Sequence, residues 1–244
     1  MYSPQLILLI DHMNIDFSRY DFQSILHDWL SNTLVTIGLP KICDLKIRAY
    51  GGWNINGVES PLRFDASKFY QTHCPALYQI GDNYFRLSFE FAETLFFHKY
   101  VDLHSEIMPF QNTVVERRAP DRIVKNRVDC FEPNCELRKV KRWLKNRKAC
   151  TNPLCPLTFS DMFYRQEQKQ VDVHLALDFI TAIKYMTSCL NICILSNDLD
   201  IVPALVFASI ENPGNKLITV GRTKSGVQYC DDYLNRNNTV ILYF

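Results

Sequence analysis

Glycine and proline are scarce in this chain, whose 244 residues include only 8 Gly and 11 Pro. We therefore do not expect disorder to dominate. The sequence also has no apolar run long enough to span a bilayer, so no membrane partner is expected, and it has no long repeat or low-complexity tract. Hydrophobic residues make up 47% of the chain, which is ample for a packed core. The length favours a single domain over residues 1–244 that carries an insertion.

The chain also lacks the marks of an exported protein. Residues 1–10 contain a short apolar run without the basic start of a signal peptide, and Asp11 ends that run. The nine cysteines are an odd number. We therefore predict a reducing, cytoplasmic compartment, where clustered cysteines indicate a metal rather than disulfides.

Strand-like and helix-like apolar patterns alternate along the chain. Strands are predicted at residues 6–10, 45–50, 190–195, 216–220 and 239–244, with extended structure around 84–95. Helices are predicted at 22–34, 66–71, 173–183, 201–210 and 226–235, whereas the pattern over 53–80 is otherwise ambiguous. This alternation predicts an α/β fold with a mostly parallel sheet and helices on both faces. In such sheets, function gathers at the carboxyl ends of the strands.

Acidic residues follow two of the predicted strands. Asp11 and Asn14 come after the first strand, Asp198 and Asp200 come after a later one, and Asp172 stands where a helix begins. If the two strands are neighbours, these carboxylates converge in one cleft, and their mutual repulsion requires a cation. Carboxylate oxygens suit Mg²⁺ or Mn²⁺. Such ions can activate water and stabilise both oxygens of an in-line phosphodiester displacement.

Each acid also has a purely structural interpretation. Asp172 and Asp198 could cap helices, and Asp11 with Asn14 could form a turn. Taken singly, each residue is better explained in this way, because such caps and turns are common. Taken together at the ends of two buried strands, they favour a functional site. Asp178 lies six residues after Asp172, which places it off the same helix face, in a supporting or structural role.

Three segments resemble motifs of the NYN domain family, a LabA-like branch of the PIN-like nuclease superfamily. Residues 10–15 resemble the motif Asp-Gly-x-Asn, residues 169–178 resemble Lys-Gly-Val-Asp with its helix, and residues 196–203 resemble Ser-Gly-Asp-x-Asp-Phe-x-Pro. The resemblance implies a PIN-like, Rossmannoid α/β fold, and RNA cleavage at an acidic metal site in many members. By position, it implies metal or catalytic roles for Asp11, Asp172, Asp198 and Asp200, supported by Asn14, Ser196 and Asp178.

The chain departs from these motifs at three glycine positions. His12 replaces the first glycine, which is expected to narrow the cleft or to add a proton donor. Gln170 and Asn197 replace the other two, and a glycine-like backbone conformation at these positions costs more energy for residues with a side chain. The resemblance covers residues 165–244 well and the first 50 residues weakly, and the middle of the chain matches nothing in the family.

Residues 112–160 are predicted to form an insertion with its own composition. Between Arg117 and Lys148, twelve Lys or Arg stand against four Asp or Glu, so this segment carries +8 and the rest of the chain −7, for a total of +1. Two Cys-x-x-Pro-x-Cys motifs predict one structural, tetrahedral Zn²⁺, with reduced surface cysteines as the alternative. The predicted ligands are Cys130, Cys135, Cys150 and Cys155. The other cysteines, expected to be ordinary buried residues, are Cys43, Cys74, Cys189, Cys193 and Cys230.

The segment between the two cysteine motifs is predicted to be a basic helix. Five cations fall on one face of it: Arg138, Lys141, Arg142, Lys145 and Lys148. A solvated charged face is the ordinary explanation of such a run, but this stripe has no acidic partners at the same spacing. Nucleic acid is the usual partner of such a patch.

These patterns together predict a metal-dependent endoribonuclease whose basic insertion grips single-stranded or structured RNA. Single-stranded DNA is kept as a second substrate. The alternative is a catalytically inactive nucleic-acid-binding module of the same fold, and a small-molecule phosphatase would leave the basic insertion without a purpose. His104 and His174 could lie near the cleft, although a lone histidine is more often structural.

Overall fold

The computed structural model describes residues 5–55, 58–96, 113–117, 125–126, 163–212, 216–223 and 239–244. The chain divides into two compact units, Met1–Thr113 with Lys169–Phe244, and Val114–Gln168. The second unit contains β8 (Lys125–Asn126) and most of β7 (Thr113–Arg117) and β9 (Phe163–Lys169), and β8 pairs with β9 in antiparallel fashion.

Several predictions fall on residues outside the described ranges. They are the helix at 226–235, the zinc ligands Cys130, Cys135, Cys150 and Cys155, the basic stripe of Arg138, Lys141, Arg142, Lys145 and Lys148, and the single residues His104 and Cys230. The zinc site and the basic stripe therefore stay predictions.

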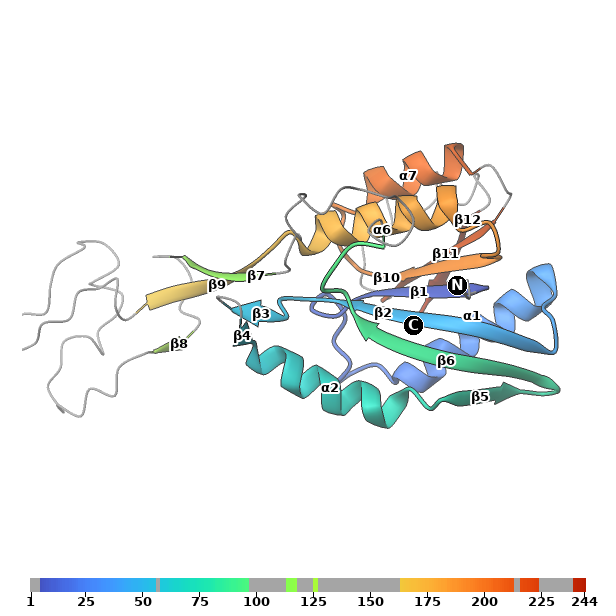
Figure 1. Cartoon of the computed structure of the whole chain (residues 1–244), viewed down its shortest axis with the longest axis horizontal. Coiled ribbons are helices and arrows are strands. Elements are labelled where there is room, and N and C mark those ends of the chain that lie inside the picture. The colour runs from blue at the N-terminus through green and yellow to red at the C-terminus, as the bar shows by residue number, and fades with distance from the viewer. Residues whose placement is uncertain are drawn as a thin grey trace, which may run out of the picture. The chain divides into compact units, whose positions relative to one another are not determined.

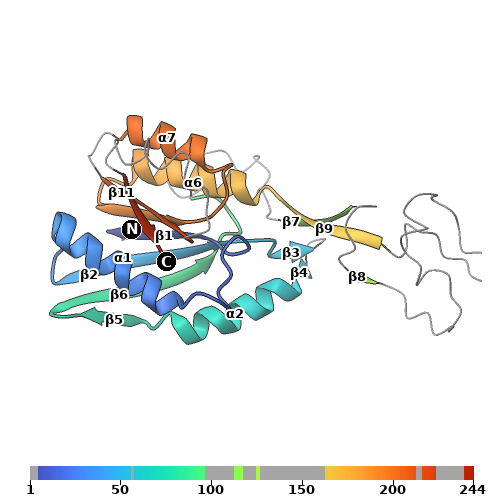
Figure 2. The same cartoon turned by 180° about the vertical axis from the view of Figure 1, so that it is seen from behind.

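A seven-stranded sheet forms the centre of the first unit, in the order β12-β11-β10-β1-β2-β6-β5 (Figures 1 and 2). Its strands are β1 (Leu6–Asp11), β2 (Ile42–Tyr50), β5 (Leu77–Ile80), β6 (Asn83–Phe91), β10 (Asn191–Leu195), β11 (Leu217–Arg222) and β12 (Thr239–Tyr243). All neighbouring pairs are parallel except β5 with β6. Strands β1 and β10 are buried along their whole length, because their continuous apolar runs are covered on both faces.

Helices cover both faces of this sheet. Helices α1 (Phe22–Ile37) and α2 (Pro61–His73) pack on one face, and α6 (Val171–Tyr185) and α7 (Val202–Ile210) pack on the other (Figure 1). Helix α1 begins where the Asp21 carboxylate accepts hydrogen bonds from the backbone amides of Gln23 and Ser24. The fold is therefore α/β with a mostly parallel sheet and is consistent with a Rossmann-like arrangement, as predicted.

The predicted strands and helices in the described part are confirmed, with shifts of a few residues at their ends. The ambiguous segment 53–80 forms a short hairpin of β3 (Asn54–Ile55) and β4 (Val58–Glu59), then α2 and β5. Helix α2 is longer than predicted because Ser60 caps it and Pro61 occupies its first turn. None of the helices among the described residues combines the length and apolar character that a membrane span requires.

Candidate metal centre

Two neighbouring parallel strands bring the first and third motifs together. Strand β1 ends at Asp11, and β10 ends at Leu195, three residues before Asp198. Ile10 pairs with Leu195, so the segments that follow β1 and β10 leave the sheet at the same edge. The condition on which the predicted cleft depended, that these two strands are neighbours, is met.

Asp172 comes from the first turn of α6. Strand β9 ends at Lys169, and Gln170 then adopts a left-handed conformation, with φ 68° and ψ −2°, immediately before the helix. Glycine adopts this conformation at the lowest energetic cost. The prediction that Gln170, in place of glycine, requires a less favourable backbone conformation is therefore confirmed. The same expectation is wrong for Asn197, which does not have a positive φ.

Three carboxylates lie close enough together to share one cation. Asp11, Asp172 and Asp198 each offer one oxygen, and these oxygens all lie within 4.8 Å of one another. Asp11 is only 1% exposed, and the other two are half-buried. Because the donors are all hard carboxylate oxygens, the set fits Mg²⁺ or Mn²⁺. We call Asp11, Asp172 and Asp198 the aspartate centre.

Two polar side chains hold the centre in place. The Oδ2 atom of Asp11 accepts hydrogen bonds from Nδ2 of Asn14 at 2.6 Å and from Oγ of Ser196 at 2.8 Å. The same Asn14 nitrogen lies 3.3 Å from Oδ2 of Asp198, and Oγ of Ser196 accepts a 3.0 Å bond from the backbone amide of Asp198. Asn14 and Ser196 therefore bridge the two strand ends, and such support orients metal ligands.

The surroundings raise the pKa of two of these acids. Burial is the main cause of the raised pKa of Asp11, the hydrogen bonds from Asn14 and Ser196 oppose it, and the charge of Asp198 adds to it. The pKa of Asp172 rises to about 6, mainly through burial and then through the charges of Asp11, Asp198 and Asp200. A cation in the centre would relieve both the burial cost and the repulsion of the ionised carboxylates.

Sequence and structure comparisons identify no relative. No family model, curated protein or solved structure matches this chain. The chemistry of the aspartate centre, and the three motifs that form it, are therefore what indicates a function.

The raised pKa of Asp172 predicts the pH dependence of stability in metal-free protein. Because its folded pKa of about 6 exceeds the ordinary value of 3.8, the free energy of unfolding falls as pH rises between these values and stays lower above them. Asp172→Asn should remove this loss and stabilise the metal-free protein at pH 7.5 by roughly 1–2 kcal/mol, after allowance for solvent screening. Urea denaturation in EDTA at pH 4.5 and 7.5 measures the difference.

Asp28→Asn is the matched control for this measurement, since the Asp28 side chain is 73% exposed on α1, and it should change stability little at either pH. Adding Mg²⁺ should stabilise the wild type more than Asp172→Asn. An Asp172→Asn protein no more stable than the wild type in EDTA at pH 7.5 would contradict the prediction.

Asp200 stands apart from the centre. Its backbone amide donates a 2.9 Å hydrogen bond to Oδ1 of Asp198, and its charge contributes to the raised pKa of Asp172. Its carboxylate is not one of the three oxygens within 4.8 Å of one another. The geometry therefore places Asp200 at the rim of the centre, where it adds negative potential.

The structural interpretations of these acids can be compared with their contacts. Neither α6 nor α7 has a side-chain hydrogen bond at its N-cap, so helix capping explains neither Asp172 nor Asp198. The backbone amide of Asn14 does donate to the carbonyl oxygen of Asp11 at 3.2 Å, so the predicted turn is present. That turn also brings the Asn14 side chain onto both neighbouring carboxylates.

Asp178 has a structural role of its own. It is fully buried, and its Oδ2 atom pairs with Nε of Arg48 at 2.9 Å and accepts a hydrogen bond from the Tyr50 hydroxyl at 2.7 Å. Its Oδ1 atom accepts a 2.6 Å bond from the backbone amide of Phe96. These contacts join α6 to β2 and to the segment after β6. Of the two roles predicted for Asp178, support of the metal centre or a structural role, they favour the structural one.

Asn197 is a supporting residue that sequence analysis did not identify. Its Nδ2 donates to the carbonyl oxygen of Asn14 at 2.9 Å. Its Oδ1 accepts hydrogen bonds from the backbone amide of Thr223 at 3.0 Å and from the Thr223 hydroxyl at 3.1 Å. The side chain thus ties the loop after β1 to the end of β11. The signal in the sequence was the replacement of a motif glycine by asparagine, whose side-chain amide can both donate and accept hydrogen bonds.

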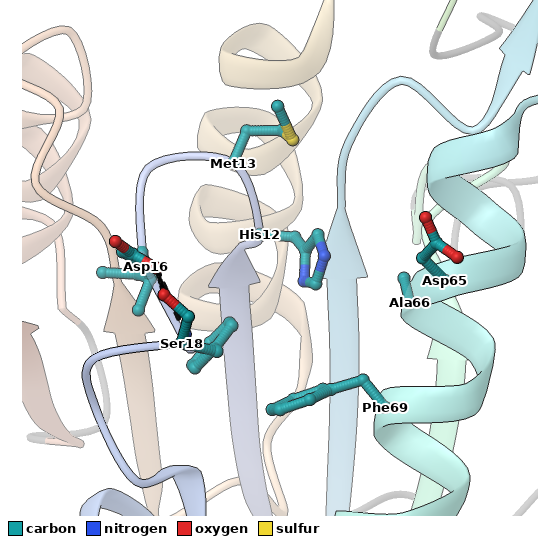
Figure 3. Close-up of a pocket in the computed structure, with 9 residues that line it drawn as sticks. His12, Met13, Asp16, Ser18, Asp65, Ala66 and Phe69 are labelled. Carbon is teal, nitrogen blue, oxygen red and sulfur yellow. Dashed lines mark hydrogen bonds between the residues drawn. The ribbon is translucent and has the colours of Figure 1, made fainter.

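The two described histidines near the motifs are neutral at physiological pH. Burial lowers the pKa of His12 to about 4, and its Nδ1 atom lies 3.0 Å from the Tyr70 hydroxyl. The ring points from the end of β1 toward α2 (Figure 3). His174 is buried in α6, and burial followed by the charge of Arg48 lowers its pKa to about 4. Of the cysteines expected to be buried, Cys43, Cys189 and Cys193 are buried and Cys74 is partly exposed.

Proposed function

We propose that this protein is a PIN-like nuclease that hydrolyses phosphodiester bonds in RNA with the help of Mg²⁺ or Mn²⁺. The observation that carries the proposal is the aspartate centre, three carboxylate oxygens within 4.8 Å of one another. It lies at the carboxyl edge of the parallel strands β1 and β10, where α/β sheets bind ligands. The likeness of its three motifs to NYN domains supports the same chemistry and favours RNA as the substrate.

Asp11, Asp172 and Asp198 are the residues that would hold the ion. When bound, the ion activates water and neutralises charge on the phosphodiester. Asn14 and Ser196 fix the Asp11 carboxylate, so that its orientation is set before the ion arrives. Because the pKa of Asp172 is about 6, this carboxylate is ionised at neutral pH even in metal-free protein.

The basic insertion over residues 112–160 is proposed to bind the RNA backbone. Its charge of +8 between Arg117 and Lys148 attracts phosphates and makes binding sensitive to salt. The four cysteines Cys130, Cys135, Cys150 and Cys155 are proposed to hold one Zn²⁺ that stabilises the insertion.

Digestion of end-labelled RNA and single-stranded DNA by the whole protein tests the proposal. Cleavage is expected with Mg²⁺ or Mn²⁺ and should stop when EDTA is added, because the centre offers only ligands that need a cation to act. RNA should be cut faster than single-stranded DNA. A second addition of Mn²⁺ in excess over EDTA should restore the rate.

Two results would overturn the proposal. Cleavage that is indifferent to EDTA would show that the activity does not depend on the centre. Binding of RNA without cleavage, at any concentration of either ion, would favour the inactive nucleic-acid-binding module instead.

A further inference from the structure

A pocket of about 650 Å³ is lined in part by the loop that follows Asp11 of the aspartate centre (Figure 3). Residues of the loop after β1, from His12 to Ser18, form one side, and Asp65, Ala66 and Phe69 of α2 form the other. His12 directly follows Asp11, so the lining of the pocket begins at the residue next to the centre in the chain. The same loop carries Asn14, whose side chain bonds to Asp11 and Asp198. One loop therefore contributes to both sites.

The spacing of residues on α2 explains why there is room for a flat ligand. Asp65 and Phe69 are four residues apart, so they lie one turn apart on the same face of the helix. Ala66, on the same side, is buried and small, and it leaves space between them. Figure 3 shows Asp65, Ala66 and Phe69 on the side of α2 that faces the end of β1.

The lining combines aromatic rings with carboxylates. The rings of Phe17 and Phe69 stack with centroids 5.0 Å apart, and the His12 ring lies 5.7 Å from Phe17. Asp16 and Asp65 are the charged residues of the lining. A phosphate group is therefore disfavoured, whereas a flat, uncharged ring with hydrogen-bond donors on its edge fits.

The two carboxylates differ in what they can bind. Asp16 already accepts hydrogen bonds from the backbone and hydroxyl of Ser18 and pairs with Arg19 at 3.0 Å. Asp65 is exposed, and no described residue donates a hydrogen bond to it or pairs with it. Asp65 is thus the carboxylate available to a ligand. A carboxylate pairs best with two adjacent donors, and among the RNA bases guanine presents this pattern at N1–H and N2–H₂.

We propose that this pocket binds one unpaired base of the RNA whose phosphodiester lies at the aspartate centre, and that Asp65 selects guanine. The aromatic lining supplies the contact with the ring, and Asp65 accepts from the Watson–Crick edge. The inference rests on the proposed function, because that function identifies the bound nucleic acid as RNA. The pocket itself can be tested without cleavage.

The first experiment measures binding of uncharged nucleosides to the whole protein in EDTA, by saturation-transfer NMR and titration. Guanosine is expected to bind about tenfold or more tightly than inosine, which lacks the N2 amino group, and than adenosine, because each hydrogen bond to a charged group is worth about tenfold. Asp65→Asn should remove the preference for guanosine. Asp82→Asn, at an exposed turn between β5 and β6, is the matched control and should keep it.

Phe69→Ala should weaken the binding of all nucleosides by a similar factor. This result would separate the contact with the base ring from the recognition of the base edge by Asp65. Since Phe69 also packs against Phe22, urea denaturation checks that this variant folds. Asp65→Asn changes an exposed side chain, so it keeps the test decisive if Phe69→Ala does not fold.

The second experiment maps the ends of RNA cut in Mn²⁺. Cuts should cluster at a fixed offset from guanine in the wild type, and Asp65→Asn should remove the clustering while cleavage continues. Guanosine binding without cleavage under any metal would support the pocket and overturn the nuclease. Metal-dependent cleavage with no guanosine preference, or a preference that survives Asp65→Asn, would overturn the pocket and leave the nuclease standing.

Discussion

Asp11→Asn and Asp198→Asn are each expected to lower metal-dependent cleavage of RNA by roughly 10³-fold, since removal of one charge-stabilising group from an active site costs about 10²–10³. Each substitution takes a negative charge from a centre whose oxygens lie within 4.8 Å of one another. The neutral amide that replaces it binds Mg²⁺ or Mn²⁺ far less well. Initial rates on end-labelled RNA, at saturating substrate and fixed Mn²⁺, measure the loss.

Two further substitutions calibrate that loss. Asp28→Asn, on α1, should leave the rate unchanged. Asp200→Asn should cost much less than Asp198→Asn, because the Asp200 carboxylate lies outside the three that share one cation site. Ser196→Ala should weaken metal binding by about 10–100-fold through the loss of its hydrogen bond to Asp11.

Folding must be preserved for these rates to be informative. Both Asn variants should keep the urea midpoint of the wild type or exceed it in EDTA, because each removes one of three mutually repelling charges. Wild-type rates in either variant would show that the cleavage site is elsewhere, and the metal assignment would be withdrawn.

Arg48→Met is expected to lower the free energy of unfolding by about 3–5 kcal/mol, the usual cost of breaking a buried ion pair from one side. Arg48 is 2% exposed and Asp178 0% exposed, and Arg48 is the cation that pairs with Asp178 in the described part of the chain. Among the described residues, removing it leaves the buried carboxylate with only the Tyr50 hydroxyl and the Phe96 amide as partners. Urea denaturation of the metal-free protein measures the cost.

The pH dependence of this loss identifies its cause. Burial already raises the pKa of Asp178, and Arg48 opposes that rise. Without Arg48 the folded pKa lies further above the unfolded value, so the variant should lose more stability at pH 8 than at pH 5. Arg48→Met combined with Asp178→Leu should recover much of the loss, because the buried carboxylate is then removed and Glu90, which also pairs with Arg48, keeps its ion pair with Lys46.

An exposed ion pair provides the control for Arg48. Arg19, whose side chain is 77% exposed, pairs with Asp16, and Arg19→Gln should cost at most about 1 kcal/mol. If Arg48→Met costs no more than Arg19→Gln, or its cost does not change with pH, the buried pair does not stabilise the fold as we infer.

The spacing of apolar residues predicted most of the elements that position the site. The run that ends before Asp11 is wholly apolar, and the run before Asp198 has one polar residue, Asn191, among apolar ones. This pattern predicts strands that are covered on both faces. The stripe of α1 and the helix after Gln170 follow from helical periodicity. The segment of α2 could not be bounded in this way, because few of its residues are buried and its start depends on the cap at Ser60.

The candidate site shows the same division. That Asp11, Asp172 and Asp198 are acids beside predicted element ends is readable from the sequence. Their roles separate only through distances that depend on the packed structure: Asp200 is two residues from Asp198 yet lies outside the centre, and Asp178 turns toward Arg48 instead. Asn197 joins two strand ends through contacts 183 and 26 residues apart in the chain, which no local pattern encodes.

The sequence by itself determined the type and order of the elements and the chemical nature of the acids, because periodicity and side-chain chemistry are local properties. The tertiary structure decided which of those acids meet. The parallel pairing of β1 with β10 brings together two segments that lie about 185 residues apart in the sequence. The left-handed conformation of Gln170 leads into the helix that carries the third carboxylate. The pocket lined by the loop after Asp11 likewise exists only because α2 packs against that loop, where His12, Phe17 and Phe69 come into contact.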